Sequence, residues 1–407
     1  MTLDSALPNG GTLLPTLSIH ADSRLRTAAD VTAPISVSTT FEYAAGDVKG
    51  SNYGGDQSYH YARINTPTVA KAEAVLDALT EGHAVVYGSG LTAAFAVLVE
   101  YRPRKIALAE CYYGVKSVVE QYRRLVPGVQ VVGADCAYDG VDLVWLESPV
   151  NPSGEVKDIQ SYALRAHAAG AALVVDATLA PPPLSYPFRQ GADVVVHSAT
   201  KYLGGHSDLL AGVVVSRCPK QADRLREARS VLGTGTGGLE AWLLLRSLRT
   251  LSVRVRQQSN TAARLVALLE GYRRSAVATT CHTPSAQQLA LGRGIAKISH
   301  ASLQQCAAGR TFIHAQHPDG FGAVFAISFA TGEQALFVAR HLQLHRFATS
   351  LGGVESLVDW RHGWDATTAP GLLRVSVGLE GFDDLAADWA QALKALDAHE
   401  RLAAAKL

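Results

Sequence analysis

Short apolar segments alternate with amphipathic segments between residues 66 and 215. Several apolar segments are rich in β-branched residues and almost free of polar ones: AVVYGSG, KIALAE, VQVVGAD, VDLVWLESP, AALVVDAT, ADVVVHSAT and AGVVVSR. The segments VAKAEAVLDALTEG and IQSYALRAHAAG instead repeat apolar residues at helical spacing. Apolar strands that alternate with helices predict an α/β fold whose mainly parallel sheet is covered on both faces.

The pattern differs on either side of this stretch. Residues 1–65 are irregular and rich in Gly, Thr, Ser and Tyr, whereas residues 239–271 read as one long helical stretch. The C-terminal part mixes strands (AVFAISF, LLRVSVGLE) with helices (EQALFVARHLQL, DDLAADWAQALKALDAHERLAAA). We therefore expect an N-terminal arm over residues 1–65, a large α/β domain over 66–275 and a smaller α+β domain over 276–407.

Composition narrows the function classes. The 407 residues are 48% hydrophobic and 18% charged with a net charge of +1, and no basic block exists that could follow nucleic-acid phosphates. No apolar run reaches the roughly 18–20 residues of a membrane helix, and the N-terminus lacks a secretory pattern. The five cysteines are scattered without a CxxC pair, so we expect a cytoplasmic protein with free thiols and no metal site.

Polar residues stand where the predicted strands end. Gly90 begins a helix after AVVYGS, Asn151 follows VDLVWLE, Asp176 ends AALVVD, and the run His197-Ser198-Ala199-Thr200-Lys201 follows ADVVV. In an open α/β sheet, ligands bind outside the carboxyl ends of the parallel strands. We therefore expect these side chains to lie around one ligand.

This combination is the one that pyridoxal phosphate (PLP) requires. Its aldehyde needs an amine for a Schiff base, its pyridinium nitrogen needs a carboxylate, and its phosphate needs hydroxyls and the N–H groups of a helix N-terminus. Each residue alone has an ordinary explanation, since Lys201 fits a solvated side chain, Asp176 a helix cap and Gly90 a turn. Together they predict a PLP site.

Longer motifs carry a resemblance to a known family. In chain order they are YARINTPT, GSGLTAA, ECYYG, LESPVNP, VVDAT, HSATKYLGGHSD, SLGGVESL and LLRVSVGLE, and the resemblance extends from about residue 17 to 398. The chain resembles the Cys/Met-metabolism family of PLP enzymes, relatives of cystathionine γ-synthase and γ-lyase. The resemblance implies the PLP-dependent transferase fold of the aspartate-aminotransferase type.

The resemblance also implies a role for each matching residue. Lys201 would form the Schiff base and move protons, Asp176 would pair with the pyridinium nitrogen, and Arg374 would bind the substrate α-carboxylate. Tyr112 would stack on the ring and act in proton transfer, Asn151 would lie near the ring hydroxyl, and Thr178 would support the ring. The implied phosphate ligands are Tyr61, Arg63, Gly90, Leu91, Ser198 and Thr200; Ser350 and Glu355 complete the substrate site.

Other interpretations of some of these residues stay open. Tyr112 could be an interface aromatic, Thr178 could cap its turn, and Ser350 could serve loop geometry, while His197 and His206 read as packing residues. In the family, the residues matching Tyr61 and Arg63 reach the phosphate of the neighbouring subunit. The resemblance therefore implies a homotetramer, a dimer of dimers with shared active sites.

Three departures from the family pattern concern the substrate. Ser117 stands where the family can place an arginine that contacts a distal carboxylate, Asn65 replaces a glycine, and residues 358–371 form a short segment that lacks a Met-Thr-His element. The short form is similar to fungal members of the family, some of which act in secondary metabolism.

The resemblance thus implies γ-replacement on an O-acyl-L-homoserine, with O-acetyl expected, through a vinylglycine ketimine that a thiol, carbon or nitrogen nucleophile attacks. One alternative is a γ- or β-lyase of a sulfur amino acid. Another, from a different class, is a non-catalytic PLP-binding regulatory protein.

Overall fold

The computed structural model describes residues 13–25, 29–42, 59–277, 291–305 and 312–405, which divide into two compact units. Unit 1 comprises residues 1–147 and 158–253, and unit 2 comprises residues 148–157 and 254–407. The division falls inside helix α8 (Leu251–Val277), whereas the sequence analysis expects a boundary near residue 275. The expected three-domain organisation stays a prediction, and much of the arm, like Cys281 and Cys306, lies outside the described residues.

The sheet of unit 1 is mainly parallel. Among the described residues it has seven strands in the order β1-β7-β6-β5-β4-β2-β3, in which β7 runs antiparallel to both β1 and β6. The other pairs are parallel. The strands are β1 (His83–Tyr87), β2 (Lys105–Leu108), β3 (Gln130–Gly133), β4 (Leu143–Glu147), β5 (Ala172–Asp176), β6 (Val194–Ser198) and β7 (Gly212–Ser216).

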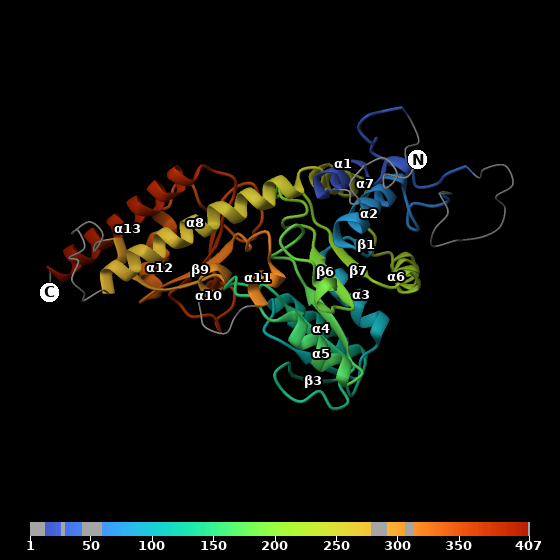
Figure 1. Ribbon diagram of the computed structural model, residues 1–407, viewed down its shortest axis with the longest axis horizontal. Coiled ribbons are helices and arrows are strands. Elements are labelled where there is room, and N and C mark those ends of the chain that lie inside the picture. The colour runs from blue at the N-terminus through green and yellow to red at the C-terminus, as the bar shows by residue number, and fades with distance from the viewer. Residues whose placement is uncertain (1–12, 26–28, 43–58, 278–290, 306–311, 406–407) are drawn as a thin grey trace. The chain divides into compact units, whose positions relative to one another are not determined.

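Helices α2, α3, α4 and α6 follow or precede strands of this sheet directly in the chain (Figure 1). Several begin at a residue whose side chain caps the first turn, as Ser89 does for α3 and Asp158 for α5. The helices are α1 (Leu14–His20), α2 (Pro67–Thr80), α3 (Gly90–Tyr101), α4 (Tyr113–Leu125), α5 (Ile159–Ala168), α6 (Pro219–Leu232) and α7 (Gly238–Leu248), with 3₁₀ turns η2 (Ser23–Leu25) and η3 (Pro187–Gln190).

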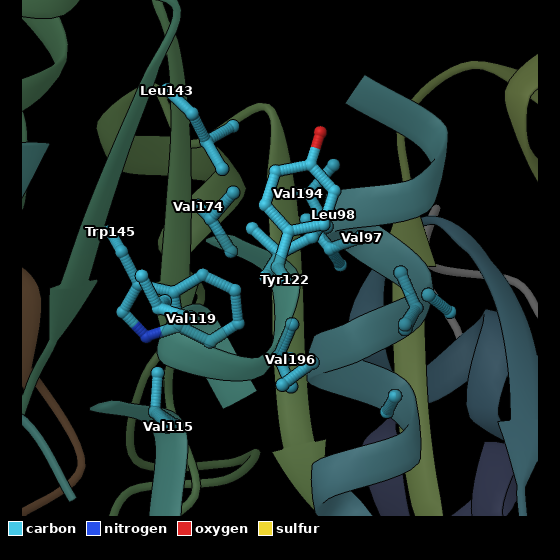
Figure 2. Close-up of a cluster of buried hydrophobic side chains, with 14 of the residues drawn as sticks. Val97, Leu98, Val115, Val119, Tyr122, Leu143, Trp145, Val174, Val194 and Val196 are labelled. Carbon is cyan, nitrogen blue, oxygen red and sulfur yellow. The ribbon is translucent and has the colours of Figure 1, made fainter. Parts of the chain in front are cut away.

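A buried apolar cluster joins the sheet to α3 and α4. Figure 2 shows Trp145 of β4 beside Val115 and Val119 of α4, with Val174 and Val196 from the neighbouring strands. Side chains buried on one face of a strand alternate with those on the other, so the valine-rich strands can cover both faces of the sheet. This packing fixes the strand ends, where the candidate site residues lie.

Unit 2 contains a smaller sheet. Its described strands lie in the order β10-β11-β12-β9-β8, with β10 parallel to β11 and the other pairs antiparallel. They are β8 (Ile295–Ser299), β9 (Val324–Phe329), β10 (Arg346–Phe347), β11 (Leu357–Trp360) and β12 (Leu372–Ser376). The other elements are α10 (Ala301–Gln305), α11 (Phe312–Gln316), α12 (Gly332–His341), η4 (Arg361–Gly363) and α13 (Phe382–Ala404).

The predicted α/β class and the mainly parallel sheet are confirmed. Two details differ. The long helical stretch is two helices, α7 and α8, and the side chain of Arg249 between them bonds to Asp22 and to the carbonyl groups of Ser18 and Ile19. Residues 14–20 of the expected irregular region form the short helix α1. Among the described residues, none of the helices is both long and apolar enough for a membrane span.

Candidate active site

Three polar residues at the ends of β5 and β6 are linked by hydrogen bonds. The Thr178 N–H donates to Asp176 Oδ1 over 3.0 Å, and the Ser198 N–H donates to Thr178 Oγ1 over 2.8 Å. The parallel register of β5 and β6, in which Asp176 lies opposite Val196, places the two strand ends side by side. Thr178 therefore connects the predicted cofactor carboxylate to the predicted phosphate-binding segment.

Asp176 is a buried carboxyl group. Its side chain is almost closed off from solvent, and burial raises its pKa above the usual range, although hydrogen bonds from Thr178 oppose this shift. A charged group in such surroundings gains most from a cation placed beside it. The protonated ring nitrogen of PLP is a cation of this kind, so the donor set at Asp176 fits the cofactor.

The N-terminus of α3 lies against the same strand ends. A Cβ atom on Gly90 would lie 2.9 Å from the Ser198 Cβ, and one on Gly212 would lie 2.1 Å from the Ser89 carbonyl oxygen. Only glycine permits these approaches, which bring the first N–H groups of α3, from Gly90 and Leu91, near Ser198. A helix N-terminus beside a serine hydroxyl can hold a phosphate group.

Lys201 lies in a tight turn directly after β6. Its N–H donates to the Ser198 carbonyl over 3.1 Å, and its own carbonyl accepts from the Gly205 N–H over 2.6 Å. The Thr200 hydroxyl is bonded to the backbone of Ala211, the residue before β7. The turn therefore fixes the backbone of Lys201, and the predicted phosphate contact of Thr200 stays a prediction.

Tyr112 begins α4 in the neighbourhood of α3. Its N–H donates to Glu147 Oε2 over 2.7 Å, and Glu147 lies opposite Asp176 in the register of β4 and β5. A Cβ on Gly114 would lie 2.5 Å from the Tyr112 ring and 3.0 Å from the Leu91 side chain. Gly114 thus leaves room for the tyrosine ring next to the predicted phosphate site.

Tyr61 and Arg63 are exposed in the segment before α2. The Arg63 guanidinium donates to the Ser230 carbonyl of α6 over 2.8 Å and lies 5.6 Å from the centre of the Tyr61 ring. Their expected contact with the cofactor phosphate of a neighbouring subunit stays a prediction.

Unit 2 places the predicted substrate residues around Arg374 of β12. The buried guanidinium donates to the Ser350 carbonyl over 2.7 Å and to Asn151 Oδ1 over 3.2 Å. Ser350 has a φ of 76°, a left-handed conformation that costs energy for a residue with a side chain and that aims its carbonyl at Arg374. Glu355, half-buried in the loop before β11, belongs to the same unit.

The sequence analysis missed several residues of these two clusters. Ser89 and Gly212 shape the N-terminus of α3, and Glu147 holds Tyr112. In unit 2, Asp359 Oδ2 accepts hydrogen bonds from both Arg374 and Arg361. Glu147, in WLESP, and Asp359, in LVDW, were visible as acidic residues inside apolar runs, which is the sequence signal that could have found them.

His197 and His206 fit the structural interpretation given to them. His197 is buried and burial lowers its pKa to about 4, so its imidazole is neutral at neutral pH. His206 Nδ1 lies 2.8 Å from the Gly204 carbonyl. Among the described residues, no group of three or more His, Cys, Asp or Glu side chains is arranged to hold a metal ion.

Comparison with known proteins agrees with the geometry. The model of the family described as Cys/Met metabolism PLP-dependent enzyme matches residues 15–394. The chain is 32% identical to a cystathionine γ-lyase of Saccharomyces cerevisiae, over 93% of this chain and 96% of the relative. It is 31% identical to a cystathionine γ-synthase of Mycobacterium bovis, with the same coverage of 93% and 96%. A crystal structure of a methionine γ-lyase from Micromonospora echinospora superposes with a TM-score of 0.80 at 31% identity, covering 95% of this chain and 99% of that one.

The family match spans nearly the whole chain, and the clusters at Asp176 and at the start of α3 have the donors that its cofactor needs. The chain therefore belongs to the Cys/Met metabolism PLP-dependent enzyme family, and it is an enzyme of amino-acid metabolism whose cofactor is pyridoxal 5′-phosphate.

Proposed function

We propose that the protein catalyses γ-replacement on an O-acyl-L-homoserine and prefers the O-acetyl ester. In this reaction the Cγ–O bond breaks, acetate leaves, and a thiol, carbon or nitrogen nucleophile bonds to Cγ and releases its proton. The observation that carries the proposal is the linked series Asp176–Thr178–Ser198 with Lys201 in the following turn. Bound PLP supplies the electron sink that stabilises negative charge at the substrate Cα.

The residues of the chain divide the remaining work. Lys201 removes the proton from the substrate Cα and returns a proton later, because its backbone is fixed beside the Ser198 carbonyl. Tyr112 covers the ring and serves as a second proton-transfer group. Arg374, held by Ser350 and Asn151, binds the α-carboxylate through its planar guanidinium.

The preference for an acetyl ester rests on Ser117. Its exposed side chain donates to the Tyr113 carbonyl over 3.2 Å within the first turns of α4, so it offers a neutral hydroxyl where relatives can have an arginine. A succinyl ester brings a second carboxylate, which a neutral position does not attract. Ser117→Arg should therefore narrow the gap in kcat/KM between acetyl and succinyl esters, and Lys116→Ser, one residue away, is the control that should leave it unchanged.

A lyase is the second candidate, because relatives named as cystathionine γ-lyase and methionine γ-lyase share the family. In elimination no nucleophile adds at Cγ; Cγ takes up a proton instead, and water hydrolyses the released enamine to ammonia and a 2-oxo acid. Incubation of the holoenzyme with O-acetyl-L-homoserine, with and without cysteine, homocysteine or a small β-keto acid, separates the two by product mass. We expect adducts that contain the added nucleophile; 2-oxobutanoate and ammonia as the main products with every partner would instead identify a lyase.

We further propose that the active enzyme is a homotetramer with active sites shared between neighbouring subunits, supported by the exposure of Tyr61 and Arg63. Arg63→Ala and Lys201→Ala subunits should each be inactive, and their mixture should regain part of the activity because one hybrid site is intact. Exchange of subunits without recovery would contradict shared sites.

A further inference from the structure

Arg361 lies close to the predicted substrate arginine through a shared carboxylate. Asp359 Oδ2 accepts from Arg361 Nη1 over 3.1 Å and from Arg374 Nη2 over 3.0 Å. All three side chains are buried, with exposed fractions of 7%, 4% and 3% for Arg361, Arg374 and Asp359. The burial of three charged groups carries a large desolvation free energy, which suggests a role for this cluster beyond holding a loop.

The register of the sheet explains why the three groups meet. Asp359 of β11 and Arg374 of β12 are directly opposite each other. Arg361 follows Asp359 by two residues and begins η4, immediately after β11 ends at Trp360. Arg361 lies outside the strand, and its hydrogen bond to Asp359 Oδ2 places its guanidinium beside the carboxylate that Arg374 also contacts.

The loop that carries Arg361 is closed on itself. The Trp360 indole N–H donates to the Pro370 carbonyl over 2.7 Å, His362 Nδ1 lies 2.7 Å from the Thr368 carbonyl, and the Asp365 N–H donates to the Arg361 carbonyl over 2.9 Å. These bonds lie within residues 358–371, the short segment singled out in the sequence. None of these three bonds involves the Arg361 guanidinium, which pairs with Asp359.

We propose that Arg361 is a positioning residue that strengthens the binding of the substrate α-carboxylate by Arg374; this rests on the proposed role of Arg374. Asp359 and the substrate carboxylate compete for one guanidinium. Arg361 takes a share of the Asp359 charge and adds a positive charge beside the site, so both effects favour the incoming carboxylate. Without Arg361, Asp359 pairs with Arg374 alone and the local charge becomes less positive.

The test compares two ligands that differ only in the carboxylate. L-2-Aminobutyrate has the four-carbon chain of homoserine without its leaving group, and n-propylamine is the same molecule without the carboxylate. Each is titrated into the holoenzyme, and the change in cofactor absorbance gives the dissociation constant. Since neither ligand needs to react, the ratio of the two constants reports carboxylate binding whether the enzyme is a synthase or a lyase.

Arg361→Gln should weaken the binding of L-2-aminobutyrate by about ten- to a hundredfold, the order expected for one unit charge in a buried site, and should leave n-propylamine unchanged. If Arg361→Gln disturbs folding, Arg361→Met replaces the aliphatic part of the arginine without its charge and should weaken the binding of L-2-aminobutyrate to the same extent. Arg401→Gln, at an exposed ion pair of α13, is the control. A purely structural role would lower the melting temperature and leave the ratio as it is.

A double-mutant cycle decides whether Arg361 acts through Arg374. In an Arg374→Gln background, Arg361→Gln should change the ratio much less than it does in the wild-type background, because only its positive charge beside the site can then act. An equal loss in both backgrounds would overturn the proposal, because Arg361 would then bind the carboxylate by itself. If the ratio of dissociation constants changes with Arg374→Gln but not with Arg361→Gln, the role proposed for Arg361 is wrong and that of Arg374 is not affected. If the ratio does not change with Arg374→Gln either, the proposed substrate site is wrong as well.

Discussion

Asp176 of unit 1 and Asp359 of unit 2 are both buried carboxyl groups, but they have opposite surroundings. Asp176 receives a hydrogen bond from Thr178, and burial raises its pKa. Asp359 receives two guanidinium groups on a single oxygen atom. The first carboxylate lies in an environment that gains from an added cation, and the second lies beside arginines that can bind an added anion.

This difference indicates which partner each cluster suits. A cofactor with a cationic ring offsets the cost of burying Asp176, and an amino acid with a negative carboxylate suits the cluster at Arg374. If the proposed assignments hold, cofactor and substrate bind at two clusters that favour ligand groups of opposite charge. Changes in one cluster should alter cofactor chemistry, and changes in the other should alter substrate affinity.

Removal of the lysine should have the largest effect. Lys201→Ala should lower kcat by at least about a thousandfold, because no other group of the β6 turn offers an amine for proton transfer at the substrate Cα. The absorbance of lysine-bound cofactor should disappear as well. Lys220→Ala, at the exposed start of α6, is the matched control, and an alanine variant at 201 with full turnover would refute the assignment.

Asp176→Asn should lower kcat by about a hundredfold, since a neutral amide does not keep the ring nitrogen protonated. The same change should stabilise the cofactor-free protein at neutral pH. The pKa of Asp176 is higher in the folded protein than in the unfolded chain, where it is 3.8. Its contribution to the free energy of unfolding is therefore fully present below pH 3.8 and is lost as pH rises through the folded pKa.

The gain in stability of the cofactor-free Asp176→Asn variant should therefore grow with pH and vanish in acid, as measured by chemical unfolding. Asp139→Asn, on the exposed loop before β4, is the control. A variant that is less stable than wild type at neutral pH would contradict the view that Asp176 lacks a compensating charge.

Arg374→Gln should act on binding more than on chemistry. We expect KM for O-acetyl-L-homoserine to rise by about a hundredfold with a smaller change in kcat, because a charged hydrogen-bonded pair is lost from a buried site. Arg340→Gln, at the exposed end of α12, should leave both constants unchanged. A fall in kcat with an unaltered KM would show that Arg374 acts in the catalytic steps. The division between a cofactor cluster and a substrate-binding cluster would then be wrong.

Much of unit 1 was predictable because its information is local. The apolar strands, the glycine at the start of α3 and the polar residue at each strand end are all visible as short patterns, and parallel strands place their carboxyl ends at one edge. Asp176 and Lys201 could therefore be predicted as site residues from the sequence, and their roles stay predictions. Their longer motifs made the family resemblance specific.

The cluster in unit 2 could be predicted only in part. Arg374 was identified by its motif, but its contact with Asp359 depends on the register of β11 against β12, and no short pattern encodes that register. Arg361 is separated from Arg374 by a loop whose closure depends on the Trp360 and His362 hydrogen bonds. Register and loop closure are properties of the folded chain, so the cluster of Asp359, Arg361 and Arg374 could be seen only in the structure.

The smallest effect is expected from the removal of the Thr178 hydroxyl, which links the ends of β5 and β6 in unit 1. Thr178→Val keeps the shape of the side chain but leaves the half-buried Ser198 N–H without its acceptor, which costs about 1–2 kcal/mol. The PLP dissociation constant should therefore rise by about five- to thirtyfold, while the carboxylate ratio of L-2-aminobutyrate to n-propylamine stays constant. Thr178→Ser retains the hydroxyl and should bind the cofactor nearly as well as wild type. Equal losses in Val and Ser would show that the methyl group matters instead, and a changed carboxylate ratio would show that the two clusters are not independent.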